Sequence, residues 1–158
     1  MESVITDEMR ATIGKESSPT VAEVERGGIR MFARAVGHTD PIYFDVAAAK
    51  AAGYRDIPAP PGYLGTPIFD PQKGARTANE FGGPKPKREL KRVLNGGTDY
   101  EYFDDICAGD TITSTTHTAS YEEREGSIGH MLIVTTKTVY KNQAGKKVAE
   151  MTGTSIRY

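Results

Sequence analysis

The sequence contains a single cysteine and no tryptophan among its 158 residues. Because Cys107 has no partner in the chain, an internal disulfide and a multi-cysteine metal cluster are both excluded. A reducing, cytoplasmic setting fits this composition. The three histidines are scattered along the chain, so their spacing predicts no metal site.

Long apolar runs and an excess of either charge are also missing. Every apolar stretch is far shorter than the roughly 20 residues that a membrane-spanning helix needs. Met1 is not followed by a basic and then apolar leader, so no signal peptide is expected. With 20 Lys and Arg against 21 Asp and Glu, the net charge of -1 argues against a nucleic-acid or membrane-surface protein.

Glycine and proline are abundant instead, with 17 and 9 residues, and they gather between residues 53 and 97. We therefore expect one domain over residues 1–158, with a loop insert rich in Gly, Pro and basic residues at 70–97. Residues 1–22 are polar and predict a peripheral N-terminal segment that contains one short helix, Asp7 to Ile13.

Apolar spacing predicts a helix from Glu23 to Val36, which Gly37 ends. A second helix is predicted from Asp45 to Ala52, with Asp45 as its N-cap. Pro61 is expected in the first turn of a further helix, whose leading N–H groups point into open space.

The second half of the chain has the alternation and β-branched content of strands. Strands are predicted at Thr98–Phe103, Thr111–Tyr121, Met131–Tyr140 and Val148–Tyr158, with turns at Glu122–Gly126 and Asn142–Gly145. Long strands after a helical first half predict an α+β fold, with helices on one face of a curved antiparallel sheet.

Four separate pieces of sequence occur in the order and spacing of a known family. They are Phe32–Asp45, which contains Gly-His-Thr-Asp-Pro-Ile-Tyr, the piece Ala59-Pro60-Pro61-Gly62-Tyr63-Leu64, Leu94-Asn95-Gly96-Gly97, and Ala108-Gly109-Asp110. Over about residues 20–158 the chain resembles the MaoC-like (R)-specific enoyl-CoA hydratases and 3-hydroxyacyl-thioester dehydratases. The branch with a fatty-acid-synthase-like dehydratase N-terminal domain is the most similar.

The resemblance implies a hot-dog fold, in which a long antiparallel β-sheet wraps around a central helix and two such domains pair edge to edge. It implies a hydro-lyase subunit in a homo- or hetero-oligomer, with coenzyme A or a carrier protein as the handle of the acyl thioester and no other cofactor. Some members of this branch are non-catalytic subunits paired with an active partner. The acyl group and the role of the insert at residues 71–88 stay open.

Both catalytic side chains of the family are replaced in this sequence. Position by position, His38 stands at the family's Asp, Asp40 at its Asn, and Tyr43 at its His. Pro61, Gly62 and Tyr63 correspond to the substrate-binding piece, in which the Gly62 N–H would face the thioester oxygen.

Three interpretations follow from these replacements. The subunit is silent and its partner supplies the Asp/His pair, since phenol is a poor base near neutral pH. Alternatively, His38 and Asp40 form a relocated pair with Tyr43 as donor. In the third, the fold serves thioester hydrolysis, or acyl-thioester binding without turnover.

Each of these residues also has a purely structural interpretation. His38 is then a solvated residue after a helix, Asp40 a turn former, Tyr43 a core aromatic, and Gly62 a packing residue. The basic run Lys85–Arg92 is either a solvated loop or a contact for coenzyme A phosphates or an acidic carrier protein.

Overall fold

The computed structural model describes residues 2–66 and 83–158. Its helices are α1 (Asp7–Thr12), α2 (Arg26–Ala35) and α3 (Val46–Ala51), with two 3₁₀ turns, η1 (Pro41–Tyr43) and η2 (Tyr63–Gly65). Its strands are β1 (Thr20–Glu23), β2 (Val93–Tyr102), β3 (Thr111–Gly126), β4 (Gly129–Lys141) and β5 (Lys147–Arg157). The α+β composition predicted from the sequence is confirmed.

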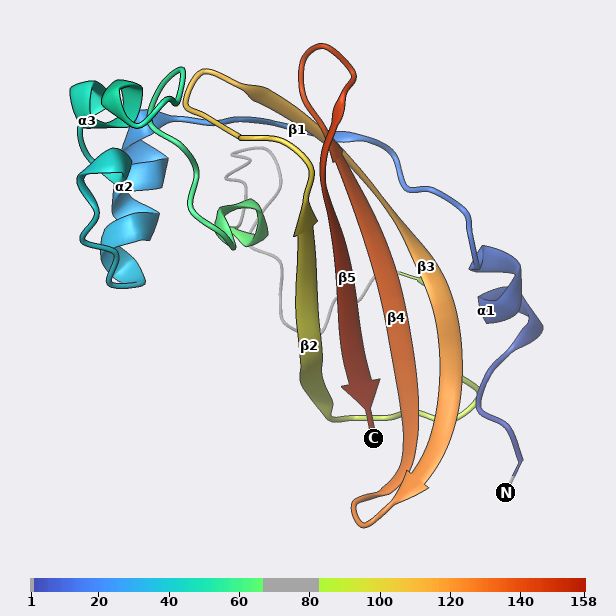
Figure 1. Cartoon of the computed structure of the whole chain (residues 1–158). Helices are drawn as coiled ribbons and strands as arrows, with labels where there is room; N and C mark the ends of the chain where they lie inside the picture. Colours follow the sequence, from blue (N-terminus) through green and yellow to red (C-terminus); the bar gives the residue numbers. More distant parts are fainter. Residues whose placement is uncertain (1, 67–82) are drawn as a thin grey trace.

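The strands form one antiparallel sheet in the order β1-β3-β4-β5-β2. The long strands curve side by side, and α2 and α3 gather beyond one end of the sheet (Figure 1). The longest described helix, α2, has 10 residues. The helix predicted from Pro61 can be checked up to residue 66, because residues 67–82 lie outside the described residues.

Two predicted helices have the ends that local signals indicate. The His38 N–H donates to the Ala33 carbonyl at 2.9 Å, which closes α2 around Gly37. The Asp45 side chain accepts the Ala48 N–H at 2.8 Å and caps α3. These contacts fix where the chain leaves α2 and where it enters α3, on the two sides of the segment from His38 to Tyr43.

The predicted loop at residues 70–97 is wrong at its end, because β2 begins at Val93. Gly96 lies within β2, where the register with β5 shifts between Asn95 and Gly97. A Cβ atom on Gly96 would lie 2.9 Å from Cγ2 of Thr154, so the glycine permits close packing. The part of this insert at residues 70–82 lies outside the described residues.

The predicted polar turn at Glu122–Gly126 is also wrong, because β3 continues to Gly126. Charge pairing explains why these polar residues form a strand. His130 of β4 lies 2.8 Å from a carboxylate oxygen of Glu123 and 2.8 Å from one of Glu125. Opposite charges across neighbouring strands stabilise the pairing that hydrophobic alternation does not reveal.

The segment before α2 follows the outer edge of β3. Strand β1, which was not predicted, pairs with Thr111–Ser114. Further back, the Ser17 and Gly14 N–H groups donate to the carbonyls of Thr116 and Thr118 at 2.8 and 2.9 Å. Near the start of the chain, the Ser3 hydroxyl donates to Glu123 at 2.5 Å. This edge of the sheet is therefore covered along much of its length.

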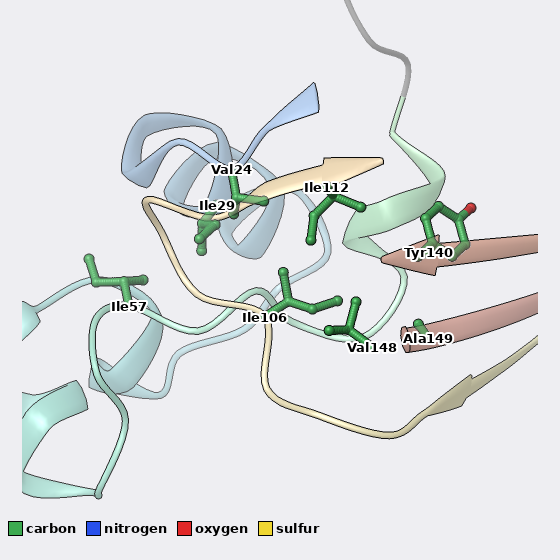
Figure 2. Close-up of a cluster of buried hydrophobic side chains, with 8 residues drawn as sticks. All are labelled: Val24, Ile29, Ile57, Ile106, Ile112, Tyr140, Val148 and Ala149. Carbon is green, nitrogen blue, oxygen red and sulfur yellow. The ribbon is translucent and has the colours of Figure 1, made fainter. Parts of the chain in front are cut away.

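A buried cluster joins the helical end of the molecule to the sheet (Figure 2). It contains Val24, Ile29, Ile57, Ile106, Ile112, Tyr140, Val148 and Ala149. Complete burial of an Ile side chain such as Ile29 or Ile57 contributes roughly 1.5–3 kcal/mol. This cluster therefore anchors the loops that carry the candidate site.

Candidate functional site

The segment from His38 to Tyr43 crosses from α2 to α3 through η1. The Asp40 Oδ1 atom accepts the Ile42 N–H at 3.0 Å and caps this 3₁₀ turn, with Pro41 as the first residue. The Asp40 carboxylate thus performs the structural task that an Asp-Pro pair predicts. In the described part of the chain, no bond joins this carboxylate to the His38 ring.

The aromatic rings of His38 and Tyr43 lie together. Their centroids are 4.9 Å apart with an angle of 38° between the ring planes. Burial raises the pKa of Tyr43, and the nearby Tyr54 and Asp40 raise it further. The phenol therefore stays protonated near neutral pH, where it can donate a hydrogen bond but is a poor base.

Tyr43 lines a cavity of about 250 Å³ near the helical end of the sheet. The cavity is also lined by Tyr54, Pro58, Ala59, Pro61, Tyr102, Asp104, Asp105 and Ile106. A site of this size is at the small end for ligand pockets. It can enclose a small chemical group but not a whole drug-sized ligand.

Gly62 adopts a left-handed conformation with φ of +88°, which favours glycine over residues with a side chain. Its N–H donates to the Tyr102 hydroxyl at 2.9 Å. The prediction that Pro61 lies in the first turn of an α-helix is wrong. The left-handed Gly62, which follows Pro61 directly, interrupts the helical path. Up to residue 66, where this described stretch ends, the helical structure after Gly62 is the 3₁₀ turn Tyr63–Gly65.

Tyr63 lies on a different side of this turn. Its ring packs edge-on against Phe32, with centroids 5.8 Å apart, and burial raises its pKa. Tyr63 lines a second cavity of about 460 Å³ between η2 and strands β1 and β3. The structure thus brings Tyr43 and Pro61 into one cavity and places Tyr63 in another.

A buried carboxylate fastens the two loops that form the walls of the first cavity. Asp110 accepts both Nη atoms of Arg55, with Nη1 at 2.6 Å, and also the Cys107 N–H at 2.9 Å and the Gln143 amide at 3.0 Å. Burial alone would raise the pKa of Asp110, but the bonds from Arg55, Cys107 and Gln143 hold it below its ordinary value. The loop containing Tyr54 is thereby held against the loop containing Asp104.

Sequence reasoning missed Tyr54, Tyr102, Asp104 and Asp105 as cavity residues. Tyr54 directly follows Gly53 in the matching family segment, so that motif carried a usable signal. Tyr102, Asp104 and Asp105 carried none, because they reach the site only through the pairing of β2 with β5. Asp104 is engaged by Lys146, with Nζ 2.8 Å from Oδ2.

The remaining charged features lie outside this cavity. In the basic run, Lys87 pairs with Glu2 at 3.1 Å and its backbone N–H donates to the Val4 carbonyl, so part of the run holds the N-terminal segment.

Within the described residues, no group of His, Cys, Asp or Glu side chains has an arrangement that could hold a metal ion. None of the helices described here is long and apolar enough to cross a membrane.

Comparisons with known proteins agree with this architecture. The family model of the FAS1-like dehydratase domain region matches residues 11–151. A UPF0336 protein from Streptomyces avermitilis is 34% identical over 124 residues, which cover 73% of this chain and 74% of that protein.

Two solved structures from Mycobacterium tuberculosis are similar over most of the chain. The ChsH1–ChsH2 complex gives a TM-score of 0.70 at 22% identity, covering 91% of this chain and 89% of that chain. The HadBC (3R-hydroxyacyl-ACP dehydratase) complex gives a TM-score of 0.69 at 21% identity, covering 92% of this chain and 96% of that chain. At these identities the likeness concerns the fold, and it confirms the predicted hot-dog architecture.

Proposed function

The chain belongs to the family of the FAS1-like dehydratase domain region, and on that premise we propose that it is an acyl-thioester-binding subunit of an enoyl-thioester hydratase or 3-hydroxyacyl-thioester dehydratase. A second hot-dog subunit supplies the Asp/His pair. One observation carries the proposal: Tyr43, at the family's catalytic His position, is a protonated phenol in the wall of the cavity.

The reaction explains why this observation matters. Hydration adds a hydroxyl group at C3 and a proton at C2 of the enoyl thioester, so one group must take a proton from water and another must supply one. Tyr43 is a poor base, and the Asp40 carboxylate caps η1. The cavity can therefore hold the acyl thioester while the proton transfers fall to a partner subunit.

Strand β2 is the edge at which we place that partner. At the opposite edge the outermost strand is β1, which has only four residues, whereas β2 has ten. Strand β2 pairs only with β5 in the described sheet, and nine of its ten residues are exposed. An edge strand with unpaired backbone groups is a template for a strand from another chain. The similar structures are a ChsH1–ChsH2 complex and a HadBC complex, which supports association with a second subunit.

Reconstitution tests the proposal. The chain is expressed alone and together with a hot-dog protein from a neighbouring reading frame that carries Asp-x-Asn-Pro-x-His, and loss of the enoyl thioester is followed spectrophotometrically. We expect no turnover by the chain alone, turnover by the complex, and none after replacement of the partner's Asp/His pair. Absence of both turnover and acyl-thioester binding in either setting would refute the proposal.

Substitutions in this chain separate a silent subunit from a catalytic one. His38→Ala and Tyr43→Phe should leave turnover by the complex within a few-fold of the unchanged complex, because neither side chain moves a proton. A loss of several hundred-fold, which corresponds to about 3.5 kcal/mol of transition-state stabilisation, would instead support the relocated pair.

A second candidate, catalysis by this chain alone, is favoured by the presence of Asp104 and Asp105 in the same cavity as Tyr43. A carboxylate in this position can activate water for hydration or for thioester hydrolysis. Turnover by the isolated chain that Asp105→Asn abolishes would support this candidate. Release of a free thiol, detected with a thiol-reactive dye, would identify the reaction as hydrolysis.

A further inference from the structure

Tyr102 connects the Gly62 amide to the small cavity, because its hydroxyl group bonds the amide and the residue also lines the cavity. Its oxygen accepts the Gly62 N–H at 2.9 Å. Tyr102 is among the residues that line the cavity, together with Tyr43 and Pro61. Gly62 itself is not among the residues that line this cavity, so Tyr102 is the member of the hydrogen-bonded pair that a ligand in it would contact.

This hydroxyl group has unused hydrogen-bonding capacity. A phenolic hydroxyl has one proton to donate and can accept through its oxygen lone pairs. In the part of the chain that the structure describes, the Gly62 amide is its one hydrogen-bond partner, and the hydroxyl acts there as acceptor. Its own proton remains available to a ligand. Accepting one bond also polarises the hydroxyl and strengthens the bond that it donates.

The surroundings hold the Tyr102 ring in this position. Its ring stacks on that of Tyr100, two residues earlier on the same face of β2, with centroids 5.8 Å apart and an interplanar angle of 18°. The strand pairs Tyr102 with the buried Ala149 of β5. The residue is nonetheless 38% exposed, so it is not sealed off from a ligand.

From this geometry we propose that Tyr102 is a substrate-contacting residue, whose hydroxyl donates the hydrogen bond to the thioester carbonyl oxygen. Gly62 then acts one step further back, as the group that orients and polarises this hydroxyl. The inference rests on the proposed function, because it takes the ligand of the cavity to be an acyl thioester. It reassigns the direct donor from the backbone of residue 62 to a side chain on β2.

A pair of ligands that differ only in the carbonyl oxygen tests the assignment. Butyryl-CoA carries the thioester carbonyl, whereas the thioether S-butyl-CoA lacks it, and neither undergoes hydration. Binding of both is measured by calorimetry for the unchanged chain, for Tyr102→Phe, and for Tyr100→Phe. The last is a matched control, because Tyr100 lies on the same strand and face and its hydroxyl does not bond Gly62.

The unchanged chain should bind the thioester more tightly than the thioether. Tyr102→Phe should reduce this preference about two- to tenfold, the range expected for one lost hydrogen bond, and leave thioether affinity unchanged. Tyr100→Phe should keep the full preference. Retained thioether binding shows that the cavity of the Phe variant is intact.

The other outcomes each reject the assignment. An unchanged preference in Tyr102→Phe would mean that the hydroxyl does not meet the carbonyl oxygen. A selective gain in thioester affinity would mean that Tyr102 blocks the Gly62 amide, which would then be the direct donor. An equal loss for both ligands would mean that the hydroxyl group affects the cavity without contacting the carbonyl. Binding of neither ligand by the unchanged chain would overturn the inference and count against the proposed function, whereas the first three outcomes leave that function standing.

Discussion

Replacement of Asp110 by alanine should lower the free energy of unfolding by about 3 kcal/mol. The Asp110 side chain is 1% exposed. Its loss leaves the buried Cys107 N–H without an acceptor, at a cost of about 1–3 kcal/mol. The Arg55 side chain is 51% exposed and can be solvated again, so its lost pairing contributes about 1 kcal/mol or less. The cavity left by the carboxylate adds a smaller loss.

Urea unfolding followed by far-UV circular dichroism measures this effect. With a slope near 2 kcal/mol per molar urea, a loss of 3 kcal/mol moves the midpoint down by about 1.5 M. Asp7→Ala is the matched control, because the Asp7 carboxylate is fully exposed and lies 4.0 Å from Arg10; its midpoint should not move. A midpoint for Asp110→Ala within about 0.3 M of the unchanged protein would refute the reasoning that this carboxylate fastens the two loops.

The pH dependence of the same variant gives the sign of the carboxylate's contribution. Because the folded-state pKa of Asp110 is below its ordinary value, the carboxylate stabilises the fold above about pH 4. That contribution is lost as the pH falls through the depressed pKa. The difference in midpoint between the unchanged protein and Asp110→Ala should therefore shrink on acidification. A difference that grows in acid would show that the wrong protonation state has been assigned.

Three further predictions concern other parts of the molecule. Gly62→Ala should destabilise the fold by about 1–2 kcal/mol in urea unfolding, since residue 62 has a left-handed backbone conformation; an unchanged midpoint would show that the turn relaxes easily. Leu94→Lys, on the exposed β2 edge, should reduce co-purification of the partner subunit while the chain's own unfolding midpoint stays the same; undiminished co-purification would place the interface elsewhere. Hydrogen bonds to Glu125, the larger effect, and to Glu123 raise the pKa of His130. The ion pairs therefore stabilise the fold fully below about pH 6.5, and this stabilisation is lost as the pH rises through the raised pKa. Unfolding midpoints from about pH 5 to about pH 9 should fall more for the unchanged protein than for His130→Gln, and parallel curves would contradict the assignment.

The features that were predictable from the sequence depend on neighbours a few residues away. The end of α2 at Gly37, the Asp45 cap of α3 and the turn at Asn142–Gly145 all belong to this kind. In each, one residue type satisfies a backbone group within the same turn, so a short stretch of sequence suffices.

The features that were not predictable depend on residues far apart in the chain. The start of β2 at Val93 and the extension of β3 to Gly126 are set by cross-strand partners rather than by hydrophobic alternation. The same cause explains the site. Tyr43 and Pro61 were recognisable from their family motif, whereas Tyr102 reaches the cavity only because β2 pairs with β5.

The N-terminal segment along β3 makes the two edges of the sheet unequal in length. On one side the outermost strand is β1, with four residues, and on the other it is β2, with ten. Two chains that pair through β2 bury both long edges and leave a short strand at each outer side of the joined sheet. Assembly through β2 therefore favours a pair over a filament, because short edge strands are poor templates for further strand addition.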